Sequence, residues 1–395
     1  MALFPEYDDL TDEQQEVCED IESELLVVSG PPGTGKTVVA FWRARQLLAV
    51  NEDVRIVMYN NTLQRYVHDW EMEVRASASI PANSPKLKID TFHKWIWDWL
   101  TSGRSAFYSR NELASFNFNT PWDEILDEID ERQRTGRDIP KWPNLIIDEG
   151  QDLDLGFYRV LERMRHYELA PTAMVSADEN QIITNSRTTI TEMCERLGCS
   201  TTPDGESHHI LTQNFRNTAE IHETAKHFYS GAKTGIASAP QRTGDKPILY
   251  VTSSNPRKKE RLIKMIRSRP ALRSAVIVKR KSEVKRITEF LEQQELPGTT
   301  IQHYVSGPGN KELAKSLDFD SPDTVTVLTA DSCKGLEFDA VYIHDLDKWD
   351  GAEQEFKNKF YVMSSRSREF LEFQCASQNA NSLEMMPQNL ARISE

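Results

Sequence analysis

The fold of this 395-residue chain follows from one stretch, Gly30-Pro31-Pro32-Gly33-Thr34-Gly35-Lys36-Thr37. The stretch fits the pattern G-x-x-x-x-G-K-[ST], with an apolar run of strand character, Leu25–Ser29, before it and a helical pattern, Val38–Leu48, after it. Glycines allow the backbone to fold around a phosphate group with its N–H groups turned inward, and the start of the helix adds partial positive charge. The sequence therefore predicts a nucleotide-phosphate cradle between a strand and a helix.

A second strand end carries two carboxylates that complete this chemistry. The apolar run Asn144–Ile147 is followed directly by Asp148 and Glu149. We expect Lys36 to reach the β- and γ-phosphates of ATP, and Thr37 and Asp148 to hold Mg²⁺. Glu149 would orient and deprotonate the attacking water. Together the two stretches predict an ATPase that uses Mg²⁺.

Apolar runs alternate with amphipathic helical stretches along the whole chain, which predicts an α/β fold with parallel sheets. The polar segment Ser200–His209 contains a turn signal, and we place a domain boundary there, between residues 1–205 and 206–395. The expected strands are Leu25–Ser29, Val54–Tyr59, Leu87–Thr91, Leu145–Ile147, Ala173–Ser176, Ile248–Val251, Ala275–Val278, Val325–Thr329, Ala340–Ile343 and Leu371–Cys375.

The charge and the apolar content of the chain limit which binding partners and which cellular location we expect. The net charge of −14 argues against nonspecific coating of nucleic acid by the whole surface, although it leaves room for a local basic groove. No apolar run approaches the roughly 20 residues that span a bilayer, and the N-terminus lacks a signal-peptide pattern. We therefore expect a cytoplasmic protein with no membrane partner. The five cysteines show no metal-binding or disulfide spacing.

The run Asp148-Glu149-Gly150-Gln151-Asp152 resembles the D-E-[AG]-Q-D signature of the UvrD/Rep/PcrA family of superfamily I helicases. Further stretches resemble the motifs of that family and follow in the same order. They are Leu10-Thr11-Asp12-Glu13-Gln14, Tyr59-Asn60-Asn61-Thr62, Thr91-Phe92-His93, Asp178-Glu179-Asn180-Gln181, Gln213-Asn214-Phe215-Arg216, the segment Thr329–Phe338 and the segment Tyr361–Glu369.

This resemblance implies two RecA-like P-loop NTPase domains that share one ATP site. In the first domain, Gln14 would read adenine and Gln181 would sense the γ-phosphate. In the second, the ring of Phe215 would stack on adenine, while Arg216 and Arg366 would contact the γ-phosphate, with Arg366 as the arginine finger. The catalytic residues implied are Lys36, Asp148, Glu149, Gln181, Arg216 and Arg366.

The same resemblance implies contact with single-stranded nucleic acid, with DNA expected ahead of RNA. In the segment that resembles T-x-H-x-x-K-G-L-E-F, Gly335 and Glu337 would link the nucleotide to the strand. The residues expected to touch the strand itself are Tyr59, Asn60, Asn61, Thr91, Phe92 and His93.

Three features depart from the family pattern. Ser186 stands where the family has a base-stacking tryptophan, and Asp331 stands where it has a histidine. The segment 94–143 is shorter than the helical insertion that relatives carry, so we expect a small helical insertion in the first domain. Trp95 and Trp99 within it are spaced i, i+4, which favours burial on one helix face over stacking on bases.

Three functions therefore remain open. The first is an ATP-dependent helicase or translocase on single-stranded nucleic acid. The second is a nucleotide-hydrolysing switch or accessory subunit that works with a protein partner such as a nuclease or repair factor, for instance in phage defence, without unwinding strands. The third is a P-loop kinase of small molecules, against which the two arginine motifs of the second domain argue.

Overall fold

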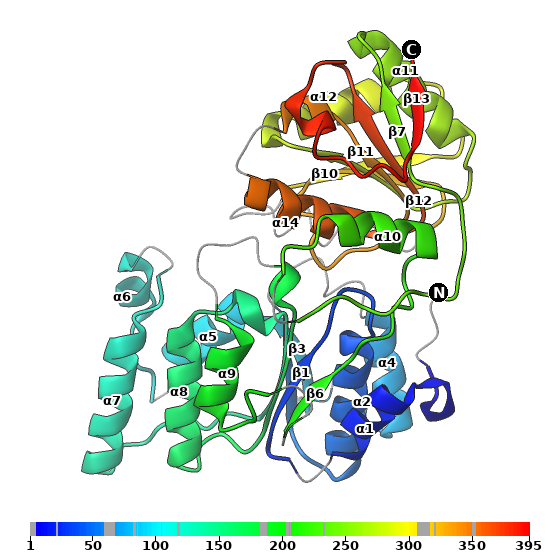
Figure 1. Cartoon of the computed structure of the whole chain (residues 1–395). Helices are drawn as coiled ribbons and strands as arrows, with labels where there is room; N and C mark the ends of the chain where they lie inside the picture. The colour runs from blue at the N-terminus through cyan, green and yellow to red at the C-terminus, as the bar shows by residue number, and fades with distance from the viewer. Residues whose placement is uncertain are drawn as a thin grey trace. The chain divides into compact units, whose positions relative to one another are not determined.

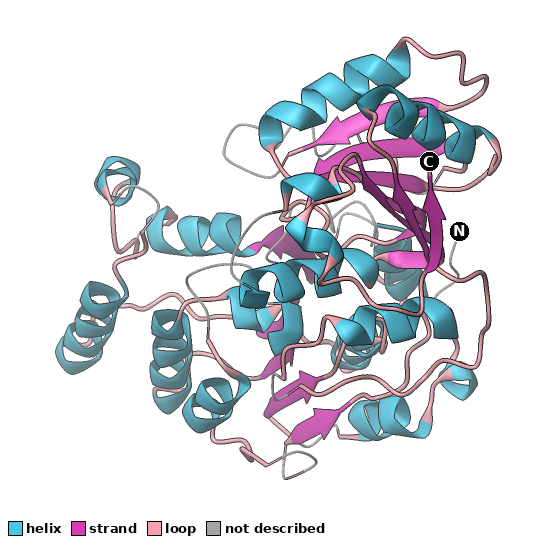
Figure 2. Ribbon diagram, turned by 45° about the horizontal axis from the view of Figure 1, so that its top comes forward, coloured by secondary structure: helices cyan, strands magenta, loops and turns pink. Residues whose placement is uncertain are grey.

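The structure, a computed structural model, divides into two compact units. The N-terminal unit comprises residues 2–30 and 35–211, and the C-terminal unit comprises residues 31–34 and 212–395. The residues described are 5–20, 23–58, 68–81 (backbone alone for 68–70), 84, 86–103, 105–116, 119–181, 188–202, 205, 207–231, 234–305, 317–319, 321–349 and 353–395. Each unit contains a parallel sheet flanked by helices (Figure 1 and Figure 2), so the predicted α/β fold of two RecA-like domains is confirmed.

In the described part of the N-terminal unit, six parallel strands form a sheet in the order β3-β2-β4-β5-β1-β6. Its central strands are mostly apolar and buried, because helices cover both faces of a parallel sheet. The strands are β1 (Leu25–Ser29), β2 (Val54–Met58), β3 (Leu87–Thr91), β4 (Asn144–Asp148), β5 (Ala173–Ala177) and β6 (His208–Ile210).

Helices cover both faces of this sheet. The helices α1, α2 and α4 pack against one face, and α5 to α9 contribute to the core on the other (Figure 1). They are α1 (Asp12–Glu19), α2 (Lys36–Ala49), α4 (His68–Ser77), α5 (Phe92–Thr101), α6 (Arg110–Ser115), α7 (Trp122–Thr135), α8 (Leu155–His166) and α9 (Ile190–Leu197). The expected insertion between β3 and β4 is thus helical, formed by α5, α6 and α7.

In the described part of the C-terminal unit, seven parallel strands follow the order β13-β7-β12-β11-β8-β10-β9. They are β7 (Ile248–Val251), β8 (Ser274–Val278), β9 (Thr300–Tyr304), β10 (Thr324–Thr329), β11 (Phe338–Ile343), β12 (Ser367–Cys375) and β13 (Ala391–Ser394). Helices α11 (Asn255–Arg267) and α12 (Lys281–Glu292) share an apolar core with one face, while α10 (Ala219–His227) and α14 (Glu353–Ser364) lie on the other (Figure 1). No helix in the described ranges is long and apolar enough to cross a bilayer.

Three strands escaped the sequence prediction, namely β6, β9 and β13, and all three lie at sheet edges. An edge strand is buried less completely than a central one, so it carries no long apolar run to reveal it. The end of the polar segment Ser200–His209 is a strand, because His208 and His209 belong to β6 and pair with β1. The boundary at residue 205 stays a prediction; the compact units divide between Leu211 and Thr212.

The tryptophans of the insertion lie in the core, as their spacing predicts. Trp95 and Trp99 are buried on α5, and the ring of Trp142 lies 5.0 Å from each of theirs, centroid to centroid. Phe157 of α8 stacks on Trp142 at 5.8 Å. Because these rings are covered by one another, Trp95 and Trp99 are not available to stack on nucleic-acid bases.

A buried polar cluster joins α11 to the end of β11 in the C-terminal unit. The ammonium group of Lys258 pairs with Asp345, and Lys348 Nζ lies 2.9 Å from the second oxygen of that carboxylate. Next to them, His344 Nδ1 lies 2.7 Å from Gln374 Oε1. Burial, reinforced by the charge of Lys258, lowers the pKa of His344 from 6.5 to about 4. The histidine is therefore neutral in the folded protein at neutral pH.

This cluster makes the stability of the protein depend on pH. The folded-state pKa of His344 lies below the unfolded value, so its contribution is present above about pH 6.5 and is lost as the pH falls toward about 4. Between about pH 7.5 and about pH 5 the expected loss is on the order of 2 kcal/mol. Urea unfolding at the two pH values should show a smaller loss for His344→Gln than for the unchanged protein. The exposed His166→Gln is the control, and equal losses in all three proteins would contradict the prediction.

Candidate functional site

The phosphate-binding loop ends where α2 begins. Gly35 adopts a left-handed backbone conformation (φ 87°), and a Cβ atom there would lie 2.2 Å from Gln14 Nε2. Glycine is therefore required both by the backbone angle and by the close approach of Gln14. Lys36, the first residue of α2, is buried, and its Nζ donates to the carbonyl oxygen of Gly30 at 2.7 Å. The ammonium group is thus held over the entrance of the loop.

The parallel sheet brings a hydroxyl and a carboxylate to the same edge beside this loop. Thr37 Oγ1 donates to Asp148 Oδ2 at 3.3 Å, and Ser176 Oγ donates to Asp148 Oδ1 at 2.7 Å. Hard oxygen donors of this kind suit Mg²⁺, which takes one or two protein ligands and fills its other positions with water and substrate phosphates. Thr37 and Asp148 therefore fit the magnesium role expected from the sequence.

A chain of hydrogen bonds fixes the second carboxylate, Glu149. Its backbone is left-handed (φ 58°), which turns the side chain away from the strand, and Gln151 Nε2 donates to Glu149 Oε2 at 2.5 Å. The amide oxygen of Gln151 accepts the backbone N–H of Asp178 at 3.0 Å, and Gln181 Nε2 donates to Asp178 Oδ2 at 2.6 Å. The predicted water-activating glutamate and γ-phosphate sensor are therefore connected through two residues.

Sequence reasoning assigned no role to the residues that make this connection. Gln151 and Asp178 stand inside the quoted motifs, so a signal was present, whereas Ser176 is an ordinary strand residue without one. Gly150 is also required by packing, because a Cβ atom there would lie 2.3 Å from Val175 and 2.7 Å from the hydroxyl of Tyr158. These four residues hold the acidic groups in position.

The carboxyl groups of this site are buried, and burial raises the pKa values of two of them, Asp148 and Asp178. Burial raises the pKa of Asp148, and the charge of Glu149 adds to the effect, while Ser176 and Lys36 oppose it. Burial likewise raises the pKa of Asp178, against the influence of Lys36. Buried like charges destabilise one another unless cations offset them. The site is therefore suited to receive a divalent cation.

Gln14, the expected adenine reader, is engaged at the start of α1. The side-chain amide oxygen of Gln14 accepts the backbone N–H of Thr11 at 3.1 Å, and the backbone N–H of Gln14 donates to Thr11 Oγ1 at 3.3 Å. This reciprocal pair is a capping box, which stabilises the first turn of a helix. To bind adenine through both atoms of its amide group, the Gln14 side chain would have to release Thr11 and bind the base instead.

In the C-terminal unit, one carboxylate joins two of the predicted motifs. Glu337 Oε2 accepts from Arg216 Nε at 2.8 Å, and Glu337 Oε1 lies 3.5 Å from Arg368 Nη1. Arg216 Nη1 is buried and makes no hydrogen bond to the residues that the structure describes. Beside it, the ring of Phe215 is 49 % exposed, which is unusual for a large apolar side chain and leaves a face on which a base can stack.

Arg366, the expected arginine finger, is 1 % exposed in this structure. Its Nε donates to the carbonyl oxygen of Val362 at 3.1 Å, and its Nη1 donates to that of Leu336 at 3.4 Å. These bonds tie the arginine to the end of α14 and to the segment before β11. Gly335 in that segment has a left-handed backbone (φ 78°), which places the turn that Arg366 contacts.

Comparison with known proteins matches two parts of the chain to family models. Residues 13–187 match the family model of an AAA domain, and residues 324–371 match that of the UvrD-like helicase C-terminal domain. Together these matches support the resemblance to UvrD-like helicases of superfamily I. The solved C-terminal domain of a possible DNA helicase from Lactobacillus plantarum WCFS1 is similar at 18 % identity and a TM-score of 0.33, over 45 % of this chain and 98 % of that one. No functionally curated protein matches.

The AAA and UvrD-like helicase C-terminal matches support a helicase-like, nucleotide-hydrolysing role. The expected strand contacts of this UvrD-like chain differ in exposure. Phe92 is buried, with its ring 5.1 Å from that of Phe157, so it is not a surface for stacking bases. Thr91 is also buried, whereas His93 is exposed. The expected contacts Tyr59, Asn60 and Asn61 lie outside the described residues.

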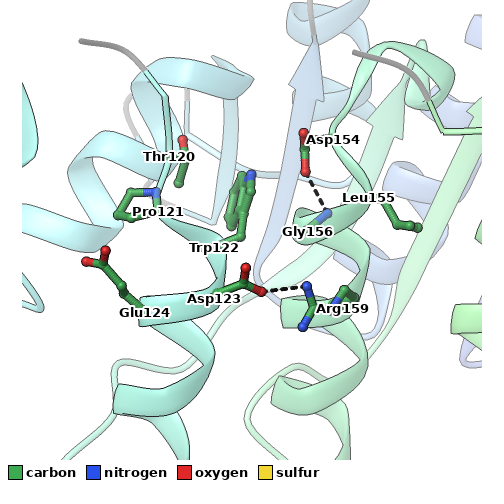
Figure 3. A pocket seen from close by; sticks show the side chains of 9 residues that line it. All are labelled: Thr120, Pro121, Trp122, Asp123, Glu124, Asp154, Leu155, Gly156 and Arg159. Atoms are coloured by element: carbon green, nitrogen blue, oxygen red, sulfur yellow. Dashed lines mark hydrogen bonds and ion pairs between the residues drawn. The ribbon is translucent and has the colours of Figure 1, made fainter. Parts of the chain in front are cut away.

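A surface pocket of about 390 Å³ lies apart from these motifs, where α7 and α8 begin (Figure 3). Figure 3 shows Trp122 between the two helix starts, the ion pair of Asp123 with Arg159 at 2.6 Å, and Asp154 capping α8 through the N–H of Gly156 at 2.7 Å. A Cβ atom on Gly156 would lie 2.3 Å from the Trp122 ring, so the pocket depends on this glycine. None of its lining residues belongs to the predicted nucleotide site.

The geometry of Glu149 gives a direct test of the UvrD-like hydrolysis site. Glu149→Gln keeps the size of the side chain but removes the base that would activate water, so hydrolysis should fall by about 10²-fold or more while nucleotide binding persists. Nucleotide binding would be followed by fluorescence and hydrolysis by phosphate release. Glu162→Gln, an exposed change on α8, is the matched control. Normal turnover in Glu149→Gln would remove this residue from the catalytic set.

Proposed function

We propose that this UvrD-like protein is an ATP-dependent helicase or translocase that acts on single-stranded nucleic acid, with DNA as the expected polymer. The observation that carries the proposal is the approach of Thr37 Oγ1 and Asp148 Oδ2 to 3.3 Å beside the phosphate-binding loop, with Glu149 next in sequence. Hydroxyl, carboxylate, lysine and glutamate are the groups that phosphoryl transfer to water requires.

In the proposed reaction, the N-terminal unit binds the nucleotide and activates water. Lys36 moves from the carbonyl of Gly30 to the β- and γ-phosphates, because a polyanion is a stronger acceptor than a peptide carbonyl. Thr37 and Asp148 would hold Mg²⁺, which would supply positive charge beside the phosphates. Glu149, held by Gln151, takes a proton from the attacking water. Gln181 would report the presence of the γ-phosphate.

The C-terminal unit would supply the remaining positive charge. Arg216 is held by Glu337 through Nε, so its Nη1 could donate to the γ-phosphate. Arg366 would serve as the arginine finger once it exchanges its carbonyl partners for phosphate oxygens. Phe215 offers an exposed ring for adenine. Loss of the γ-phosphate on hydrolysis would release these arginines, and the resulting conformational cycle would move a bound strand.

One observation favours the alternative, a nucleotide-hydrolysing switch or accessory subunit without strand unwinding. Asp331 is exposed at the position where UvrD-like relatives have a histidine beside the strand. A carboxylate there repels the phosphates of a nucleic acid. A subunit of a nuclease, repair or phage-defence complex would tolerate that carboxylate, since its ATPase would respond to a protein.

One experiment separates the two functions. ATP hydrolysis would be measured without polymer and with single-stranded DNA, duplex DNA or RNA, each at low and high salt. A translocase predicts stimulation by single strands that weakens steeply with salt, because phosphate contacts dominate its binding. Displacement of an annealed strand would add helicase activity. Hydrolysis indifferent to every polymer would contradict the translocase and favour the accessory subunit.

The arginine finger gives a further prediction. Arg366→Ala should lower the turnover number about 10³-fold, the lower range for an arginine finger, and change the KM for ATP little. Since Arg366 is buried, thermal melting would establish that the variant is folded. Arg267→Ala, which removes an exposed arginine of α11, is the control. Normal turnover by folded Arg366→Ala would exclude Arg366 from the reaction.

A further inference from the structure

One buried amide connects the two arginine-bearing segments of the C-terminal unit. Asn217, directly after Arg216, is buried, and its Nδ2 donates to the carbonyl oxygens of Ser365 at 3.3 Å and Ser367 at 2.6 Å. These carbonyls lie on either side of Arg366. Only the NH₂ end of the amide can satisfy two carbonyl acceptors, so the orientation of the side chain is fixed by its partners.

The other end of the same amide is fixed by the turn that carries Arg216. Asn217 Oδ1 accepts from Asn214 Nδ2 at 2.9 Å. Asn214 Oδ1 in turn accepts the backbone N–H groups of Arg216 at 2.9 Å and Asn217 at 3.1 Å. Both amides are therefore fully used, and they join the backbone of the Phe215–Arg216 turn to the backbone on both sides of Arg366.

A second donor bridges the same two segments. Arg242 Nη2 donates to the carbonyl oxygens of Arg216 and Arg368, each at 2.5 Å. The backbone of Arg366 is held as well, since its carbonyl accepts the N–H of Phe338 at 2.9 Å. A movement of the Arg216 turn is therefore transmitted to the Arg366 loop, because both bridges must move with it.

We propose that Asn217 is a positioning residue that couples Arg216 to the arginine finger Arg366, an inference that rests on the proposed function. Asn217 itself does not touch nucleotide. It acts by holding the carbonyls on either side of Arg366 at a set distance from the Arg216 turn, so that both guanidinium groups reach the γ-phosphate together. A mispositioned finger loses transition-state stabilisation while ATP binding by the phosphate-binding loop persists.

Asparagine is the side chain that this position requires. An aspartate of the same shape has no N–H and would place a carboxylate against two carbonyl oxygens. An alanine would leave those carbonyls and Asn214 without their partner. Serine is too short to bridge two acceptors and would restore one bond at most. We therefore expect Asn217→Asp to be the most damaging change, Asn217→Ala intermediate and Asn217→Ser the mildest.

The test measures single-turnover ATP hydrolysis and the KM for ATP in Asn217→Asp, in Arg366→Ala and in the double variant. Asn217→Asp should lower the rate about tenfold or more, because a displaced Arg366 loses part of its transition-state stabilisation, and should change the KM less than about threefold. In the Arg366→Ala background the same change should have no further effect, because it acts through Arg366. Rates are expressed per nucleotide-binding site, so that unfolded protein does not enter them.

Thr218→Ala is the matched control. Thr218 is the buried neighbour that caps α10 through the N–H of Ile221 at 3.4 Å, so its loss lowers stability without touching the bridge. It should lower the melting temperature and leave the rate per site unchanged. Asn217→Asp behaving like Thr218→Ala, or lowering the rate equally in both backgrounds, would overturn the positioning role. The unchanged protein reports separately on the proposed function: if it does not hydrolyse ATP, that function fails first and the positioning role fails with it.

Discussion

Parallel pairing of β1, β5 and β4 is the constraint on which the nucleotide site depends. Because these strands run in the same direction, their carboxyl ends meet at one edge of the sheet. The phosphate-binding loop leaves β1 there, Asp148 ends β4 there, and the segment with Asp178 and Gln181 follows β5 there. Residues 111 positions apart thus lie within hydrogen-bonding distance, as Thr37 Oγ1 and Asp148 Oδ2 do at 3.3 Å.

The second requirement is compensation of buried charge. Asp148, Glu149 and Asp178 are all buried, and a buried carboxylate is unstable unless a cation or hydrogen-bond donors offset it. Ser176, Gln151 and the backbone N–H groups provide the donors, and Lys36 provides the nearby positive charge. The same arrangement that stabilises the folded chain also places these carboxylate oxygens where the proposed site would bind a divalent cation, with Lys36 beside them as the positive group for a phosphate.

In the C-terminal unit, oxygen acceptors hold the positively charged side chains of Arg216 and Arg366. Arg216 is held by a carboxylate, Glu337, and Arg366 by main-chain carbonyls. Neutral carbonyls bind a guanidinium less strongly than an anionic phosphate does, so in the proposed reaction Arg366 would exchange its partners for a phosphate, whereas Arg216 would keep Glu337 on its Nε. The backbone would keep its position in such an exchange, because Asn217 and Arg242 bridge the backbone of the two arginine-bearing segments. Rigid backbone with exchangeable side-chain contacts is what a nucleotide-driven cycle needs.

The sequence by itself determined the phosphate-binding loop, the α/β class and the central strands, because these depend on local patterns: glycines before a lysine, and apolar runs that must be buried on both faces. It did not reveal the edge strands β6, β9 and β13, whose partial burial leaves no such pattern. Only the tertiary structure showed that Phe92 belongs to the core, that Gln151 holds Glu149, and that Asn217 reaches the carbonyls beside Arg366. These contacts join residues through folding over long sequence separations or through backbone angles, which neighbouring residues in the chain do not encode.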